Sequence, residues 1–229
     1  MSLATMQNKQ INGLIFDLDG VIADTAHLHY RAWCQIASRW GFYLTEEQNE
    51  QLKGVSRNDS IKKIIHWAGK DFSQKELNEF AIEKNSYYLN YCESIGPEDL
   101  LPGVLNFIKE SHRAGLKLAV GSASRNAKII LHKLGILNLF KIVVDGNMVE
   151  NSKPNPEVFL KSAAALNILP EECVVFEDSQ AGIQAAVNAK MFAVGIGTTH
   201  LLNCDARIQT FEKFNLIELS NQLKKYTPQ

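Results

Sequence analysis

Two aspartates, Asp17 and Asp19, follow the apolar run Leu14-Ile15-Phe16 in the first part of the sequence. The run predicts a strand that is covered on both faces, and the i, i+2 spacing places both carboxylates on one side of the extended chain. Two adjacent carboxylates repel each other, so a cation or a proton must stabilise them. An ordinary Asp-Gly turn after a strand would use the same residues, but paired acids at a strand end favour a catalytic loop.

Polar groups also follow two later apolar runs. The run 117–121 leads into Ser122-Ala123-Ser124, whose hydroxyl and backbone N–H groups could bind an anion before a helix. Taken alone, an ordinary serine N-cap explains these residues better. Lys153 follows the run 142–144, and Pro154 keeps it in an extended loop. A lone lysine usually faces solvent, but one fixed beside a strand end is a plausible phosphate ligand.

Glu177 and Asp178 follow the apolar run 173–176. By themselves they could simply complement the dipole of the next helix. Together with Asp17 and Asp19, they place four carboxylates at the carboxyl ends of predicted strands, where ligands of open α/β sheets bind. Four acids beside one lysine would repel strongly without a divalent cation, and oxygen ligands without nearby His or Cys favour Mg²⁺. The sequence therefore predicts a magnesium site.

The elements that must position these groups alternate between strands and helices, which predicts βαβ units in a parallel sheet. We expect an α/β fold with a doubly wound, Rossmann-like core. The expected strands are 14–16, 117–121, 142–144, 173–176 and 192–194, and the expected helices of the core are 104–112, 125–134, 156–166, 181–189 and a last amphipathic helix after 216.

Residues 25–96 interrupt this alternation with a purely helical pattern. Apolar residues recur there at helical spacing, and capping boxes begin at Thr45 and Ser73. The segment predicts an all-helical cap domain inserted into the core, which we expect to consist of residues 1–24 and 97–229.

Composition excludes several classes of function. The chain has 229 residues, of which 45% are hydrophobic, and 24 Lys and Arg balance 25 Asp and Glu. Without a long basic run or an apolar stretch of about 18 residues, we expect neither nucleic acid nor a membrane as a partner. The four cysteines are scattered, which argues against zinc and for a reducing compartment. Residues 1–10 lack the apolar centre of a secretory signal, so we expect a cytoplasmic location.

Four short motifs resemble, in the same order, those of the haloacid dehalogenase superfamily of phosphotransferases: Asp17-Leu18-Asp19-Gly20-Val21, the strand end at Ser122, Ser152-Lys153-Pro154 and Glu177-Asp178-Ser179. Within that superfamily, residues 52–57 resemble the cap loop and residues 122–126 the core loop of the β-phosphoglucomutase family. Arg125 departs from that family, which often has lysine there. Arginine keeps the positive charge of that lysine but binds phosphate with a different geometry.

The resemblance implies that Asp17 is the nucleophile and forms an aspartyl-phosphate, while Asp19 is the general acid and base. It implies that Mg²⁺ is held by Asp17, the Asp19 backbone carbonyl, Glu177 and Asp178. It further implies phosphate or substrate binding by Ser122, Ala123, Ser124, Arg125, Asn126, Lys153, Lys53, Gly54, Val55, Arg57 and Lys84, with Thr25, His29 and Trp33 as hinge or accessory residues.

The implied reaction interconverts β-glucose 1-phosphate and glucose 6-phosphate through glucose 1,6-bisphosphate. Arg57 would then hold the phosphate at the far end of the sugar, although a solvated surface arginine explains it equally well without the motif. The main alternative is a sugar-phosphate or phosphoglycolate-type phosphatase of the same superfamily. A non-catalytic regulatory protein would not need both Asp17 and Asp19. We expect a monomer, because this architecture needs no second chain to complete the site.

Overall fold

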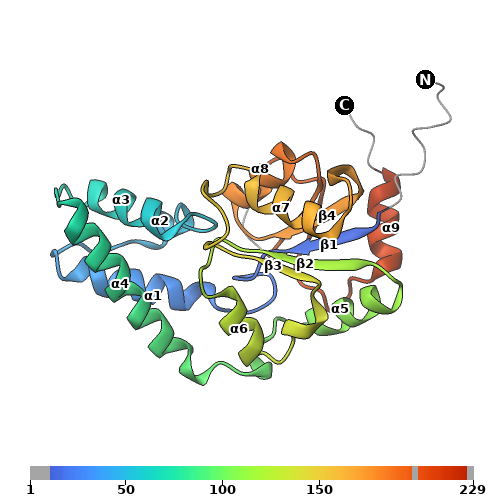
Figure 1. Ribbon diagram of the computed structural model, residues 1–229, viewed down its shortest axis with the longest axis horizontal. Helices are drawn as coiled ribbons and strands as arrows, with labels where there is room; N and C mark the ends of the chain where they lie inside the picture. Colours follow the sequence, from blue (N-terminus) through green and yellow to red (C-terminus); the bar gives the residue numbers. More distant parts are fainter. Residues whose placement is uncertain (1–10, 198–200, 226–229) are drawn as a thin grey trace.

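The computed structural model describes residues 11–197 and 201–225. Its centre is a parallel sheet with the strand order β3-β2-β1-β4-β5-β6 (Figure 1). The order reverses at β1, which pairs with β2 on one side and β4 on the other, so the predicted doubly wound fold is confirmed. The strands are β1 Gly13–Phe16, β2 Lys117–Gly121, β3 Ile142–Val144, β4 Cys173–Glu177, β5 Phe192–Ile196 and β6 Ala206–Ile208.

Strand β6 was absent from the sequence-based prediction. It is only 3 residues long and lies at the edge of the sheet, where it pairs in parallel with β5. Its middle residue, Arg207, is exposed, so the segment has neither an apolar run nor enough length to show alternation. The other five strands lie where the apolar runs predicted them.

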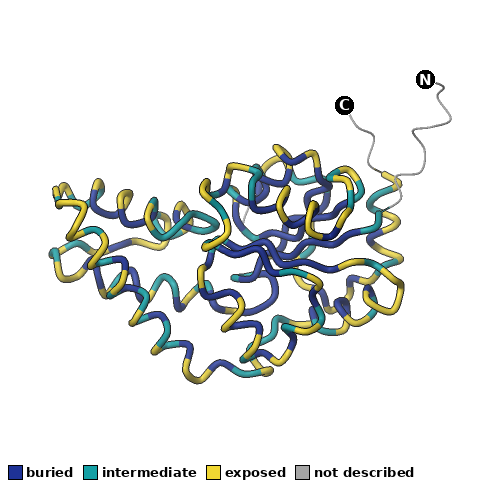
Figure 2. Tube along the Cα trace, viewed as in Figure 1, coloured by how far each residue is buried: buried dark blue, intermediate teal, exposed yellow. Residues whose placement is uncertain are grey.

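Helices cover both faces of the sheet. Residues Leu14 and Phe16 of β1 pack into the larger apolar cluster, together with residues of α5, α6 and α9, whereas Ile15 packs into the cluster beneath α7 and α8. Figure 2 shows that the strands are buried along most of their length. This two-sided burial accounts for the continuous apolar runs in the sequence. The core helices are α5 Val104–Arg113, α6 Ala127–Lys133, α7 Glu157–Leu166, α8 Gln180–Asn188 and α9 Leu216–Lys225.

A group of phenylalanines supports the strand ends that carry the acids. Phe16 and Phe176, the neighbours of Asp17 and Glu177, stack with ring centroids 4.9 Å apart. Phe107 packs edge-on against both rings, at 6.2 Å from Phe16 and 5.3 Å from Phe176. These three side chains are fully or almost fully buried, and each contributes roughly 1.5–3 kcal/mol through burial. The backbone beneath the two acids is therefore held rigidly.

The segment between β1 and α5 is helical, as predicted, and lies beside the carboxyl end of the sheet (Figure 1). It has an apolar cluster of its own, in which Trp33, Leu52 and Ile64 are buried. Residue boundaries for a separate cap domain at 25–96 stay a prediction. The helices of this segment, the cap, are α1 Ala26–Ser38, α2 Glu46–Glu50, α3 Arg57–Trp67 and α4 Gln74–Tyr91.

The two connections between cap and core run side by side. An antiparallel bridge joins Ala23 to Leu100, and the N–H of Leu101 donates to the carbonyl of Ile22 at 2.9 Å. The N–H of Asp24 donates to the carbonyl of Asp99 at 3.3 Å. The two chain connections of the cap thus form one narrow strip of backbone, which suits a hinge.

Two further observations bear on the predictions from composition. All four cysteines are free thiols: Cys34, Cys92, Cys173 and Cys204. Within residues 11–197 and 201–225, no helix is both long and apolar enough to span a membrane. The leader prediction for residues 1–10 lies outside the described residues.

Candidate active site

Three carboxylates converge at the ends of the central strands. Asp17 directly follows β1, while Glu177 ends β4 and Asp178 follows it. One carboxylate oxygen from each residue lies within 4.8 Å of the others. Gly20 allows this approach, because it adopts a φ of 80° and a Cβ there would lie 2.2 Å from an Asp178 oxygen. The pairing of β1 with β4 thus brings together acids that are 160 positions apart in the sequence.

Lys153 joins two of these acids. Its ammonium group donates to Asp17 Oδ1 at 2.6 Å and to Glu177 Oε2 at 2.8 Å, and all three side chains are buried. Burial lowers the pKa of Lys153, but the two carboxylates outweigh it and raise the pKa above its ordinary value. The lysine therefore remains charged and fixes the Asp17 carboxylate.

The acids carry more negative charge than Lys153 can balance. Burial raises the pKa of Asp17 well above its usual range, with Lys153 opposing and Glu177 adding to the shift. Burial, followed by Glu177, raises the pKa of Asp178 to about 7. The charged state of both groups would be stabilised by a cation, and the donors are all carboxylate oxygens. This cluster fits a hard divalent metal ion.

Glu177 is the most firmly held of the three acids. Its Oε1 accepts hydrogen bonds from the Ser179 N–H at 3.1 Å and from the Ser179 hydroxyl at 2.7 Å, while Lys153 binds the other oxygen. A Cβ on Gly182, in the first turn of α8, would lie 2.0 Å from Glu177 Cδ. The absence of a side chain at Gly182 therefore makes the space for this carboxylate.

We expect Gly182→Ala to lower the free energy of unfolding by about 1–3 kcal/mol, because the added methyl overpacks a buried carboxylate. Alanine otherwise favours helices over glycine by about 1 kcal/mol, so the expected sign is opposite to that of helix propensity. Urea unfolding followed by circular dichroism measures the change. A variant as stable as the unaltered protein would show that Glu177 can move aside.

Asp19 faces the cap rather than the acid cluster. Its Oδ1 accepts a hydrogen bond from the Thr25 hydroxyl at 2.5 Å, and His29 Nε2 lies 3.4 Å away. The ammonium of Lys84 lies 2.7 Å from His29 Nδ1. When Lys84 is charged it can only donate, so in that state His29 accepts at Nδ1 and carries its proton on Nε2, toward Asp19.

This series of contacts, from Lys84 of α4 through His29 of α1 to Asp19, sets the protonation state of Asp19. Burial raises the pKa of Asp19, but His29, Thr25 and Lys84 together outweigh it and lower the pKa. Burial, followed by the charge of Lys84, lowers the pKa of His29, which is therefore neutral. Burial and nearby Arg57 lower the pKa of Lys84 to about 7. Asp19 is thus ionised, and the groups that set its state belong to the cap.

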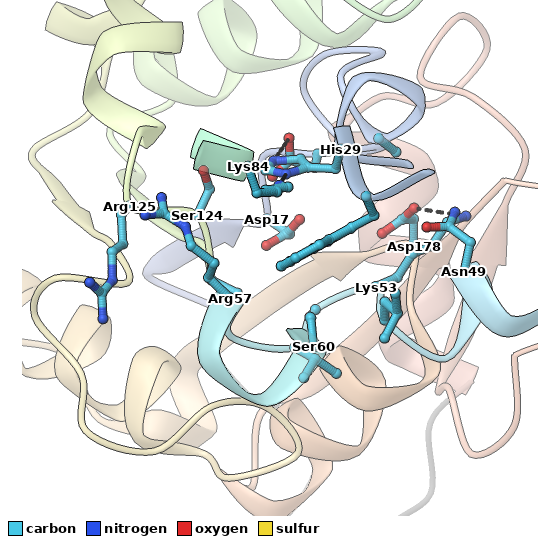
Figure 3. A pocket seen from close by; sticks show the side chains of 17 residues that line it. Asp17, His29, Asn49, Lys53, Arg57, Ser60, Lys84, Ser124, Arg125 and Asp178 are labelled. Atoms are coloured by element: carbon cyan, nitrogen blue, oxygen red, sulfur yellow. Dashed lines mark hydrogen bonds and ion pairs between the residues drawn. The ribbon is translucent and has the colours of Figure 1, made fainter. Parts of the chain in front are cut away.

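A pocket of about 720 Å³, part of it open to solvent, lies between cap and core. Figure 3 shows Arg57, Ser124 and Arg125 on one side of it and Lys53 and Asp178 on the other. The pocket brings together most of the predicted site residues, namely Asp17, Asp19, His29, Trp33, Lys53, Gly54, Val55, Arg57, Lys84, Ala123, Ser124, Arg125 and Asp178.

The remaining predicted residues do not line this pocket. Thr25 binds Asp19, and Lys153 binds Asp17 and Glu177. The buried hydroxyl oxygen of Ser122 accepts from the Ser124 N–H at 3.1 Å, which closes the tight turn after β2. Asn126 is buried and binds a residue of the cap. These groups support the residues that line the pocket.

Two contacts across the cap–core boundary were missed from the sequence. Asn85 of α4 accepts hydrogen bonds from Arg57 and Asn126, and Ser152 donates to Asp59 Oδ2 of α3 at 2.7 Å. The pocket also contains Ala26, Asn49 and Ser60, which were not predicted. No local pattern marks these residues, because their role depends on how the cap docks.

Comparison with known proteins identifies a family and relatives with a similar sequence. The family model described as haloacid dehalogenase-like hydrolase matches residues 14–196. The chain is 36% identical to β-phosphoglucomutase of Bacillus subtilis over 94% of its own length and 97% of that protein. It is 32% identical to a phosphorylated carbohydrates phosphatase of Thermotoga maritima, covering 84% of this chain and 88% of that one.

A solved structure agrees. The β-phosphoglucomutase of Clostridium difficile matches with a TM-score of 0.91 at 37% identity, covering 95% of this chain and 99% of that one. The superfamily, predicted from the motifs, and the core with a helical cap, predicted from the pattern of strands and helices, are therefore confirmed. The chain belongs to the haloacid dehalogenase-like hydrolase family and is an enzyme of its phosphotransferase and phosphatase group.

Proposed function

We propose that this enzyme is a β-phosphoglucomutase that interconverts β-glucose 1-phosphate and glucose 6-phosphate through glucose 1,6-bisphosphate. One observation carries the proposal. The same pocket holds an acid cluster with Asp17 and, on another side, the cations Arg57 and Arg125 (Figure 3). A sugar that carries two phosphates needs two such sites in one pocket, whereas a monophosphate needs one.

In the proposed mechanism, the Asp17 carboxylate attacks phosphorus in line, and the bond from phosphorus to the sugar oxygen breaks. Asp19 takes the proton of the sugar hydroxyl that attacks the aspartyl-phosphate, and it returns that proton to the departing oxygen when Asp17 is phosphorylated again. Lys153 orients Asp17 and carries positive charge beside the transferred group. Asp19 suits the base step because its lowered pKa keeps it ionised in this closed arrangement.

We propose Mg²⁺ as the cofactor, held by Asp17, Asp178 and the backbone carbonyl of Asp19. Glu177 is the fourth proposed ligand, although Lys153 and Ser179 already bind its oxygens. When bound, the ion would neutralise charge on the transferring phosphoryl group. The overall excess of acid in the cluster supports this assignment.

Cap closure supports transfer to a sugar rather than to water. Gly54 of the cap packs so closely on the core that a Cβ there would lie 2.6 Å from the Ser179 hydroxyl. Ser152 of the core and Asp59 of the cap are hydrogen bonded. A cap held this closely over Asp17 restricts the entry of water during transfer.

The alternative is a sugar-phosphate phosphatase that uses Asp17 in the same way, with water as the acceptor. The phosphatase relative of Thermotoga maritima keeps this alternative open. One experiment separates the two: each glucose 1-phosphate anomer is supplied with Mg²⁺ and a trace of glucose 1,6-bisphosphate, and glucose 6-phosphate and inorganic phosphate are measured together. Release of phosphate at the rate of substrate loss would contradict the mutase proposal.

The cap arginine provides a sharper test. We expect Arg57→Ala to lower kcat/KM for mutase turnover by roughly 100-fold, because a bidentate, partly buried phosphate contact is lost. Hydrolysis of p-nitrophenyl phosphate, which has a single phosphate, should change by less than about threefold. Arg113→Ala, at an exposed site in the last turn of α5, is the matched control. Full mutase activity in Arg57→Ala would contradict the distal role.

The remaining expectations on partners and location stay predictions. We propose that the enzyme acts on small sugar phosphates and sugar bisphosphates, as a monomer in the cytoplasm. The pocket supports the first point, because acids and cations line the same cavity between cap and core.

A further inference from the structure

Asn85 connects three separate segments through one oxygen atom. Its side-chain carbonyl Oδ1 accepts a hydrogen bond from Arg57 Nη2 at 2.7 Å and from Asn126 Nδ2 at 2.8 Å. Asn85 lies on α4, Arg57 begins α3, and Asn126 precedes α6 in the core. Both partners are donors at these atoms, so the Asn85 amide must present its oxygen to them.

The chemistry of Asn85 matters because Arg57 has no acidic partner. Among the residues that the structure describes, no carboxylate lies within 4.0 Å of its guanidinium group. Burial and the charge of Arg125 both lower the pKa of Arg57, so its positive charge is poorly compensated. An uncharged carbonyl can orient this guanidinium while leaving its charge to attract an anion. A carboxylate at position 85 would orient it equally well but neutralise it.

The contact with Asn126 links this orientation to cap closure. Asn126 is buried in the loop after β2, and its N–H donates to the Ser124 hydroxyl at 3.2 Å. Ser124 and Arg125 of the same loop line the pocket beside Arg57. When the cap moves away from the core, Asn126 and Asn85 must separate, and Arg57 then loses its fixed relation to that loop.

We propose that Asn85 is a positioning residue for the distal phosphate. It orients Arg57 without neutralising it and completes the distal site only when the cap is closed on Asn126. This inference rests on the proposed function in that it takes Arg57 as the ligand of a second phosphate. It adds a residue that selects substrates with two phosphates, or with a phosphate far from the reacting group, over substrates with one.

The test compares Asn85→Ala, which removes the acceptor, with Asn85→Asp, which keeps the shape and adds a charge. Asn78→Asp, at an exposed position of the same helix, adds the same charge elsewhere and serves as the control. For each Mg²⁺-loaded protein, kcat and KM are measured for glucose 1,6-bisphosphate as phosphoryl donor and for p-nitrophenyl phosphate. Thermal unfolding confirms that each variant is folded.

We expect Asn85→Ala to raise KM for the bisphosphate by about tenfold, as for loss of a hydrogen bond to a charged group, with kcat little changed. Asn85→Asp should raise it further, because its carboxylate competes with the phosphate for Arg57. Values for p-nitrophenyl phosphate should stay within about twofold for both. Unchanged bisphosphate kinetics, or equal losses on both substrates, would overturn the proposal.

These outcomes are independent of whether the enzyme is a mutase. Formation of glucose 6-phosphate by the unaltered protein tests the proposed function alone. A phosphatase in which Asn85→Asp selectively loses the bisphosphate would retain the inference and reject the mutase. A mutase whose bisphosphate kinetics are unchanged by both substitutions would retain the proposed function and reject the inference.

Discussion

Replacement of Asp17 by asparagine is expected to lower kcat for phosphoryl transfer by a factor of about 10⁴ or more. The amide has nearly the same shape but is a poor nucleophile, so the aspartyl-phosphate cannot form. Lys153 would still bind Glu177, so the framework of the site should persist. Turnover of glucose 1-phosphate and incorporation of ³²P into the protein measure the loss directly.

Asp145→Asn is the matched control for this variant. Asp145 is also buried and follows β3 at the same edge of the sheet, but it binds the Asn147 N–H of its own loop. We expect the control to keep its activity within about threefold. If Asp17→Asn retained Mg²⁺-dependent turnover, Asp17 would not be the nucleophile. If the unaltered protein showed no turnover at all, the non-catalytic alternative would gain support.

The second large effect is expected for Asp19→Asn, which removes the proposed proton donor and acceptor. General acid–base catalysis contributes about 10²–10⁴-fold, so kcat with glucose 1-phosphate should fall by that factor. The first step with p-nitrophenyl phosphate should fall much less, because p-nitrophenolate departs without a proton. A burst of p-nitrophenolate under single-turnover conditions measures this step separately from hydrolysis.

Asp24→Asn serves as the control, because Asp24 is exposed in the hinge and its carboxylate only approaches His27. Equal losses of Asp19→Asn on both substrates would show that Asp19 stabilises the site rather than moving protons. The Thr25 hydroxyl can still donate to the carbonyl oxygen of the new side-chain amide, so the variant should keep the local fold.

Most of the acid cluster could be predicted from the sequence, because the carboxyl ends of the strands in a parallel sheet meet at one edge. Leu14, Ile15 and Phe16 are apolar since both faces of β1 are buried, and this makes the end of the strand visible as the point where Asp17 appears. Topology then brings Asp17 beside Glu177 without further information from the chain. The acid cluster was therefore predictable from local patterns.

The site residues that the cap contributes were harder to predict from the sequence. Lys84 and Arg57 came from resemblance to a family, and nothing local distinguishes Asn85 from the exposed Asn78 on the same helix. Whether a side chain of α4 meets the core depends on how a second body docks across a hinge. The same holds for Asp59, whose partner Ser152 lies 93 positions away. Contacts between side chains of the cap and side chains of the core leave no periodic signal in either segment.

The side-by-side connections at Ala23 and Leu100 have an evolutionary consequence. Paired residues of an antiparallel bridge have Cα atoms only about 4.5–5.5 Å apart, so the chain enters and leaves the cap at almost the same point. A segment inserted there can be lengthened, shortened or replaced without changing the register of β1 against its neighbours. Selection could thus exchange the cap while Asp17, the proposed nucleophile, and Lys153 stayed in place. The hinge is therefore also the position at which one inserted segment can be replaced by another.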